Sequence, residues 1–389
     1  MNLTDIIADE TLRNEAFPIT RERIFMAHAG VNALPRVACQ ALRDFADGAC
    51  KEHQEAWWSW TKVDKTRKAA AELLGCQPKE VALIGPTSMG LNLVANGIDW
   101  QPGDEVIYYA EDYPANVYPW AKLANKGVTP VALNASVPGV LTWDLIEQAI
   151  TDKTRLVALA SCHFLSGYRV DLETIGSKLH QRDILFSVDG IQTLGAFPMN
   201  LEHVDFLSAD SHKWMLGPVG QGVFYVKQSR QELLQPSVLG AWNVVSPNYI
   251  SQDELALHEG ARRYEAGTYN LPGIHAMLAS IELLLDLGIE NIAARNLHLR
   301  RVLLDAVRPL GYQLYTESHD LDPDTTDDTR SSIVSITHPH RDMKEVMKRL
   351  KSENVTVSLR ENRSGERFLR FSPHFYNTES EIERAVALL

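Results

Sequence analysis

An aspartate and a lysine in the middle of the chain each follow a short apolar run. The run 183–188 ends at Asp189, and a second run, 204–209, is followed by Ser211-His212-Lys213. If both runs are strands of one parallel sheet, the two side chains lie at the same edge, where α/β proteins bind their ligands. A lysine among apolar residues is a candidate nucleophile toward a carbonyl group. A buried aspartate is the partner that a protonated pyridine nitrogen requires.

Polar residues also follow other predicted strands. Thr87 and Ser88 follow a Gly-Pro turn at a helix start, where free backbone N–H groups favour a phosphate, although an ordinary helix cap shows the same pattern. Tyr113 follows the second strand, where its ring could stack on a planar cofactor or pack in the core. Together with Asp189 and Lys213, these strand ends predict a site for pyridoxal 5'-phosphate (PLP).

These residues can meet at one edge only if the runs that precede them are strands of one sheet. Between residues 81 and 227, apolar runs of strand length alternate with helical patterns, which predicts βαβ units and a mostly parallel sheet. The expected strands are 81–84, 105–110, 129–133, 155–160, 184–188, 206–209 and 222–226. The expected helices are 88–96, 115–126, 142–149 and 172–181. We assign this sheet to a large α/β domain of residues 26–260.

The rest of the chain predicts an N-terminal arm and a second domain. Residues 1–25 form the arm, and a smaller α+β C-terminal domain takes residues 261–389. Its expected helices are 273–287, 289–307 and 344–350, its expected strands are 332–337, 355–359 and 368–371, and its closing helix begins at Thr378 with a capping-box spacing to Glu381. A length of 389 residues agrees with two domains.

Composition excludes several classes of protein. A net charge of −12 argues against a nucleic-acid surface. The chain has no apolar run of ~18 residues and no basic start, which predicts a cytoplasmic protein without a membrane partner. No CxxC pair occurs among the four cysteines, and His338-Pro-His340 is isolated, so we expect no metal. The glycine motifs of nucleotide-binding proteins are absent.

With these motifs in view, the chain resembles the class V aminotransferase family of PLP-dependent enzymes. The most specific blocks are residues 187–195 and 211–218, and the likeness runs from His28-Ala-Gly to the ending Ser-Pro-His-Phe-Tyr-Asn-Thr. It is similar to the isopenicillin-N-epimerase-like and cysteine-desulfurase-like branch. The resemblance implies fold type I, an α/β fold with a mostly parallel seven-stranded sheet. It also implies a homodimer with a composite active site.

The resemblance implies a role for individual residues. Lys213 forms a Schiff base with PLP and serves as acid and base, Asp189 pairs with the pyridine nitrogen, and Tyr113 stacks on the ring. The other expected cofactor contacts are Thr87, Ser88, Gln192 at the phenolic oxygen, His212, and Thr268 from the neighbouring subunit.

The expected substrate contacts are Arg370, which binds the α-carboxylate of an amino acid, and the further candidates His28 and Arg360. The resemblance, with these site residues, implies that the protein is a transferase or a lyase, namely an aminotransferase or a C–S/β-lyase. The alternatives are an epimerase of the isopenicillin-N-epimerase type and a catalytically silent member that serves as a binding or regulatory protein.

The chain departs from its resemblance in informative places. Cysteine desulfurases carry a nucleophilic cysteine near residues 359–366, whereas the last cysteine here is Cys162, so we do not expect persulfide chemistry. Asp210 stands where many relatives have a serine near the phosphate. We expect its carboxylate to point away from the phosphate, with Ser208 or Ser211 in its place.

Overall fold

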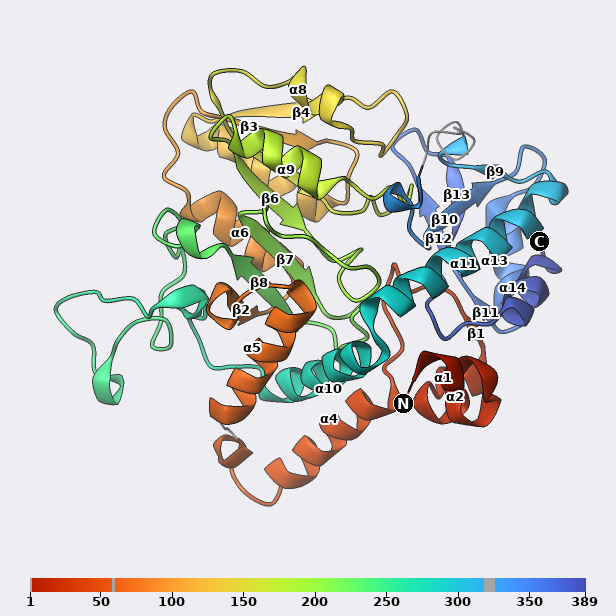
Figure 1. Ribbon diagram of the computed structural model, residues 1–389, viewed down its shortest axis with the longest axis horizontal. Coiled ribbons are helices and arrows are strands. Elements are labelled where there is room, and N and C mark those ends of the chain that lie inside the picture. The colour runs from red at the N-terminus through yellow and green to blue at the C-terminus, as the bar shows by residue number, and fades with distance from the viewer. Residues whose placement is uncertain (1, 58–59, 318–325) are drawn as a thin grey trace.

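A seven-stranded sheet forms the centre of the protein, in the order β2-β8-β7-β6-β5-β3-β4. The computed structural model describes residues 2–57, 60–317 and 326–389. The strands are β2 (Val81–Ile84), β3 (Glu105–Tyr109), β4 (Thr129–Leu133), β5 (Thr154–Ala160), β6 (Leu185–Asp189), β7 (Phe206–Asp210) and β8 (Gly222–Val226). Only β8 is antiparallel to its neighbours within this sheet (Figure 1). The predicted mostly parallel sheet is confirmed.

Helices connect the parallel strands, as expected for βαβ units. They are α6 (Thr87–Gly97), α7 (Tyr118–Ala121), α8 (Trp143–Glu147) and α9 (Leu172–His180). The helix predicted over 115–126 is instead broken into a 3-10 turn, Pro114–Asn116, the short α7, and a second 3-10 turn, Lys122–Lys126. Pro114 and Pro119 explain the break, because proline lacks an N–H group and restricts the residue before it.

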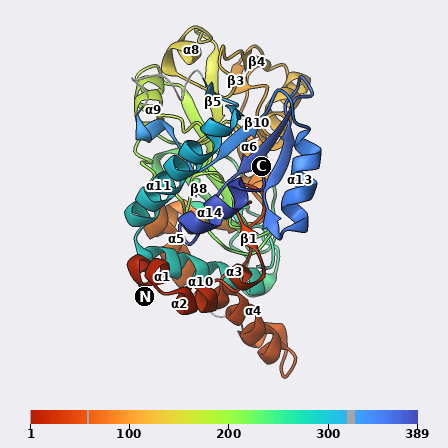
Figure 2. The same cartoon turned by 90° about the vertical axis from the view of Figure 1, so that its right-hand side faces the viewer.

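A second, antiparallel sheet is ordered β12-β13-β10-β9. Its strands are β9 (Gln313–Leu314), β10 (Val334–Thr337), β12 (Ser358–Glu361) and β13 (Arg367–Phe371). The helices α11 (Ile289–Val307), α13 (Met343–Ser352) and α14 (Glu379–Val386) share one apolar core with this sheet. Figure 2 shows the molecule from the side on which these helices lie. Because side chains alternate along a strand, the opposite face of the sheet carries the residues between the apolar ones.

The domain boundary at residues 260/261 stays a prediction, and the apolar clusters show how the segments around it pack. Helix α10 (Leu271–Leu287) packs on α4 (Arg36–Ala49) and α5 (Trp60–Leu74), and its apolar residues belong to the core of the large sheet. The core of the smaller unit begins at Leu299, within α11. That unit also takes in β1 (Ile24–Phe25), which pairs with β11 (Val355–Thr356).

No single helix of the described chain is long and apolar enough to span a membrane. Helix α10 and the segment Ile289–Leu310 reach that length and composition only as a pair, and the pair is bent by 81°.

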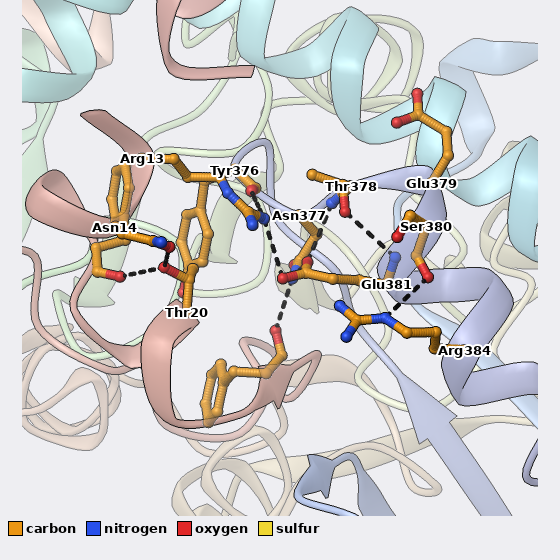
Figure 3. Close-up of polar contacts among 12 residues, drawn as sticks. Arg13, Asn14, Thr20, Tyr376, Asn377, Thr378, Glu379, Ser380, Glu381 and Arg384 are labelled. Atoms are coloured by element: carbon orange, nitrogen blue, oxygen red, sulfur yellow. Dashed lines mark hydrogen bonds and ion pairs between the residues drawn. The ribbon is translucent and has the colours of Figure 1, made fainter. Parts of the chain in front are cut away.

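The first residues form the helices α1 (Leu3–Ala8), α2 (Glu10–Ala16) and α3 (Ile19–Glu22). Arg13 of α2 and Phe17, which follows α2, contact the C-terminal segment. Phe17 stacks on Tyr376, with ring centroids 4.1 Å apart. Arg13 Nη1 donates to Glu381 Oε1 at 3.0 Å, and both side chains are buried (Figure 3). The predicted capping box of α14 is present, since Glu381 Oε2 also accepts from the Thr378 N–H group.

We expect Glu381→Ala to lower the free energy of unfolding by about 3–5 kcal/mol, because it leaves Arg13 charged, buried and unpaired. The measurement is urea denaturation at neutral pH. Glu383→Ala is the matched control, since Glu383 is exposed on the same helix and its loss is expected to cost less than about 0.5 kcal/mol. Equal midpoints for the two variants would show that the buried pair does not stabilise the docking of the N-terminal helices.

Candidate active site

A cavity of about 330 Å³ lies between the carboxyl ends of the central strands and the second sheet. Most residues predicted for the site line it: Thr87, Ser88, Tyr113, Asp189, Gln192, His212, Lys213, Arg360 and Arg370. Ligand sites of parallel sheets occur at this edge. The structure therefore brings together residues that are separated by up to 283 positions, as between Thr87 and Arg370.

The carboxylate of Asp189 is buried and held from both sides. Asn116 Nδ2 donates to Asp189 Oδ2 at 3.0 Å, and the Ile191 N–H group donates to Oδ1 at 2.9 Å. Burial raises the pKa of Asp189 to about 6, while these hydrogen bonds and the Lys213 charge oppose the rise. The carboxylate is thus ionised at neutral pH, as a partner for a protonated ring nitrogen must be.

Lys213 is also buried at the cavity wall. Burial, together with the nearby Arg370 and Arg360, lowers the pKa of its amine to about 8, although the Asp189 carboxylate opposes the fall. The Nζ atom lies 5.6 Å from the centroid of the Tyr113 ring. Because a depressed pKa makes more of the neutral amine available near neutral pH, Lys213 is prepared to attack a carbonyl group and to carry a proton.

The start of α6 forms the part of the cavity that suits a phosphate. Pro86 precedes this helix and supplies no side-chain cap, so the N–H groups of Thr87 and Ser88 have no partner within the helix. Both residues line the cavity. The Thr87 side chain faces inward instead, where its Oγ1 accepts from the Asp210 N–H group at 2.9 Å. This arrangement fits an anion held by backbone N–H groups at the positive end of a helix dipole.

Asp210 points away from this anion site, as expected. Its carboxylate accepts from the N–H groups of His212 at 3.1 Å and Gly220 at 3.2 Å. The predicted replacement by Ser208 or Ser211 is not seen: Ser208 donates to the Thr87 carbonyl oxygen and Ser211 to that of Pro218, both at 2.9 Å.

Gln192 and His212 form parts of the cavity wall. The Gln192 amide nitrogen donates to the Ala29 carbonyl oxygen at 3.0 Å, and its oxygen accepts from Trp214 Nε1 at 2.9 Å. One amide hydrogen remains for a ligand, so the contact with a phenolic oxygen stays a prediction. The Nδ1 atom of His212 lies 2.8 Å from Asp210 Oδ1, but the two groups are not aligned for a hydrogen bond.

Arg370 is the buried cation of the cavity. It is 1% exposed, and Nη1 donates to the Phe164 carbonyl oxygen at 2.7 Å, whereas Nε and Nη2 have no partner among the described residues. Burial, with Arg360 nearby, lowers the pKa of this guanidinium to about 9. A buried donor without an acceptor is costly, and a bound carboxylate would satisfy it.

Two predicted site residues lie outside the cavity of this chain. His28 is fully buried, with Nδ1 3.0 Å from the Ser372 carbonyl oxygen and Nε2 2.8 Å from the Tyr376 hydroxyl. It joins the N-terminal and C-terminal segments, so its contact with the substrate stays a prediction. Thr268 is exposed and does not line the cavity, so its role across a subunit boundary stays a prediction.

Sequence reasoning missed Asn116 and Asp112. Asn116 binds Asp189, and the buried Asp112 lies close enough to raise the pKa of Asp189. Both follow β3 within Glu111-Asp-Tyr-Pro-Ala-Asn116, so the signal was a cluster of polar residues at a strand end. A broken helix places Asn116 at the site, and the smooth helical pattern of the sequence concealed that break.

These residues fit PLP at its phosphate, its ring nitrogen and its aldehyde. The N-terminus of α6 suits its phosphate, Asp189 its ring nitrogen, Lys213 its aldehyde, and the free donors of Arg370 suit the carboxylate of an amino acid. The fold and the site define a PLP-dependent enzyme of fold type I.

Comparisons with known proteins agree. A family model described as aminotransferase class-V matches residues 24–385, and the chain belongs to this family. An uncharacterized aminotransferase of Bacillus subtilis, YcbU, is 27% identical over 377 residues, which cover 96% of this chain and 95% of the relative. A probable cysteine desulfurase of Methanothermobacter thermautotrophicus is 25% identical over 390 residues and 94% of each chain. The apo structure of a cysteine desulfurase from Thermococcus onnurineus shares the fold, with a TM-score of 0.86 and 23% identity over 96% of this chain and 95% of that one.

Proposed function

We propose that the protein is an amino-acid aminotransferase or C–S/β-lyase in which Lys213 anchors PLP and then transfers protons at the substrate Cα. One observation carries the proposal: a single cavity holds an amine with a pKa near 8, a buried carboxylate and a buried guanidinium with unpartnered nitrogens. When bound, PLP supplies an electron sink for the substrate carbon.

The residues of the chain divide the remaining work. Arg370 binds the substrate carboxylate and orients the amino acid. Lys213, neutral once its pKa of about 8 is exceeded, accepts the Cα proton and returns a proton to the product. Asp189 would be the partner of the protonated ring nitrogen, and the Asn116 amide and the Ile191 N–H group hold its carboxylate in place and favour its charged form. Tyr113 lines the same cavity, with its ring centroid 5.6 Å from Lys213 Nζ, which supports its predicted stacking on the cofactor ring.

The cysteines argue against a persulfide mechanism, although the names of several relatives include cysteine desulfurase. All four cysteines are free thiols, and none lines the cavity as the described residues define it. A lyase that releases its sulfur product directly, or a transaminase, agrees with this site. Epimerisation stays the second candidate. Tyr113 lines the same cavity as Lys213, and its hydroxyl would supply a second proton donor at a position different from that of the lysine.

The proposal includes a homodimer in the cytoplasm. Large apolar side chains are exposed on one segment that leaves the body of the protein in Figure 1: Val238, Leu239, Tyr249, Ile250 and Leu255. A second copy would cover such a surface. The exposed Thr268 follows this segment in the chain, which supports its contact with the cofactor of the other subunit.

A panel of amino acids tests the reaction class. The PLP-loaded protein is incubated with each amino acid, with and without an α-keto acid, and keto acid, ammonia, sulfide and the D-enantiomer are assayed. Transamination gives keto acid without ammonia, a β-lyase gives pyruvate and ammonia, and an epimerase gives only the D-enantiomer. A protein that binds no PLP and turns over no amino acid would contradict the proposal and favour the silent alternative.

A further inference from the structure

The cavity holds a second arginine on the same sheet as Arg370. Strands β12 and β13 pair so that Ser358 lies opposite Arg370 and Arg360 lies opposite Phe368. Residues directly opposite each other share a face, so both arginines point from the face that is turned away from the helices of the smaller unit. They are diagonal neighbours, whose side chains start about 7–8 Å apart.

Each guanidinium is attached to a different wall. Arg370 donates to the Phe164 carbonyl oxygen, which belongs to the large sheet's edge. Arg360 donates through Nη1 to its own strand, at the Leu359 carbonyl oxygen, and its Nη2 lies beside Gly30, 3.6 Å from the position of an added Cβ. The two guanidinium groups are therefore fixed to different segments at the wall of one cavity.

Neither arginine has an acidic partner within the described part of the chain. The other arginines of this hairpin are satisfied elsewhere. Arg367 pairs with Glu361 at 3.2 Å, and Arg363 donates to the Ala110 carbonyl oxygen at 3.3 Å. Arg360 is thus not needed to close the hairpin, and its free donors face the cavity.

A monocarboxylic amino acid supplies one carboxylate to a cavity that holds two guanidinium groups. These groups belong to Arg360 and Arg370, and Asp189, the carboxylate among the lining residues, is the proposed partner of the ring nitrogen. In the proposed function, the start of α6 would hold the phosphate of PLP, and Arg370 would bind the α-carboxylate of an amino acid. One guanidinium then remains, half-buried and without an anion.

We propose that the substrate is an acidic amino acid whose side-chain carboxylate is bound by Arg360 while Arg370 binds its α-carboxylate. This inference rests on the proposed function and names its substrate class. Bidentate geometry makes a guanidinium selective for a carboxylate over a neutral amide, because an amide offers one acceptor and no charge.

Pairs of isosteric amino acids test the inference: glutamate against glutamine, and aspartate against asparagine. For the better acid we expect kcat/KM about 100-fold above that of its amide, from the loss of a charge-assisted hydrogen-bonded pair. Arg360→Gln is expected to reduce this ratio to below about 5-fold, and Arg360→Lys to restore part of it. Arg367→Gln, on the same sheet but outside the cavity, is the control and keeps the wild-type ratio.

Equilibrium binding gives a readout that is independent of turnover. Glutarate, which carries both carboxylates and no amine, is titrated into the PLP-loaded protein by calorimetry, with butyrate as the monocarboxylate. We expect glutarate to bind about 10-fold or more tightly than butyrate, and Arg360→Gln to remove the difference.

The outcomes separate this inference from the proposed function. Turnover of neutral amino acids as fast as acidic ones, or an acid-to-amide ratio unchanged in Arg360→Gln, would overturn the inference and leave the proposed function standing. If no amino acid is turned over, the proposed function fails, and the glutarate titration alone decides whether the cavity selects two carboxylates.

Discussion

Replacing Lys213 with alanine is expected to remove the visible absorbance band of the bound cofactor and to lower turnover by about 10⁴-fold. Both effects have one cause, because the same amine attaches PLP and transfers the proton at the substrate Cα. Among the residues that line the cavity, Lys213 carries the amine, and its pKa is lowered to about 8 by burial. The methyl group of alanine can neither attach PLP nor transfer a proton, so added PLP is not expected to restore activity.

Borohydride reduction followed by mass spectrometry of peptides measures the attachment. In the wild-type protein the added mass should lie on the peptide that contains Lys213. Lys348→Ala is the control, because Lys348 lies on the surface of α13 beside Glu345 and should change neither attachment nor rate. A Lys213→Ala protein that keeps the visible band and its turnover would show that another amine is used.

Asp189→Asn is expected to lower turnover by about 10²- to 10³-fold, the typical cost of removing one preorganised electrostatic partner. Asparagine has nearly the same shape and can still accept from the Ile191 N–H group, so the fold should survive. It cannot carry the negative charge that keeps a pyridine nitrogen protonated. Its amide would also face Asn116 Nδ2, a donor that now binds the carboxylate.

The pH dependence of PLP affinity tests the same residue. Burial raises the pKa of Asp189 to about 6, so its charge is present above pH 6 and is lost as the pH falls through that value. We therefore expect the wild-type advantage over Asp189→Asn to grow with pH through about 6. Asp183→Asn is the control, since Asp183 is exposed and has a positive φ that asparagine tolerates. An advantage that does not depend on pH would contradict the assigned role.

The sequence alone determined the strands of the large sheet and the cavity residues that follow those strands. Each predicted strand of that sheet ends within one residue of an observed one, because strands buried on both faces of a parallel sheet appear as continuous apolar runs. Thr87, Asp189 and Lys213 were found by the same logic, since the carboxyl ends of parallel strands meet at one edge. These are local patterns with a fixed geometric consequence.

Only the tertiary structure decided what closes the cavity. Arg360 and Arg370 were expected only from the family resemblance, and the residue pattern around them did not place them. They reach the cavity because the register of β12 and β13 turns both side chains to one face, and a slip of one residue would turn them to the other. The lone His28 carried no local signal of its partners, which lie 344 and 348 residues later in the chain. Asn116 reaches Asp189 across 73 residues. Such contacts depend on how distant segments pack, and no periodicity of neighbouring residues encodes them.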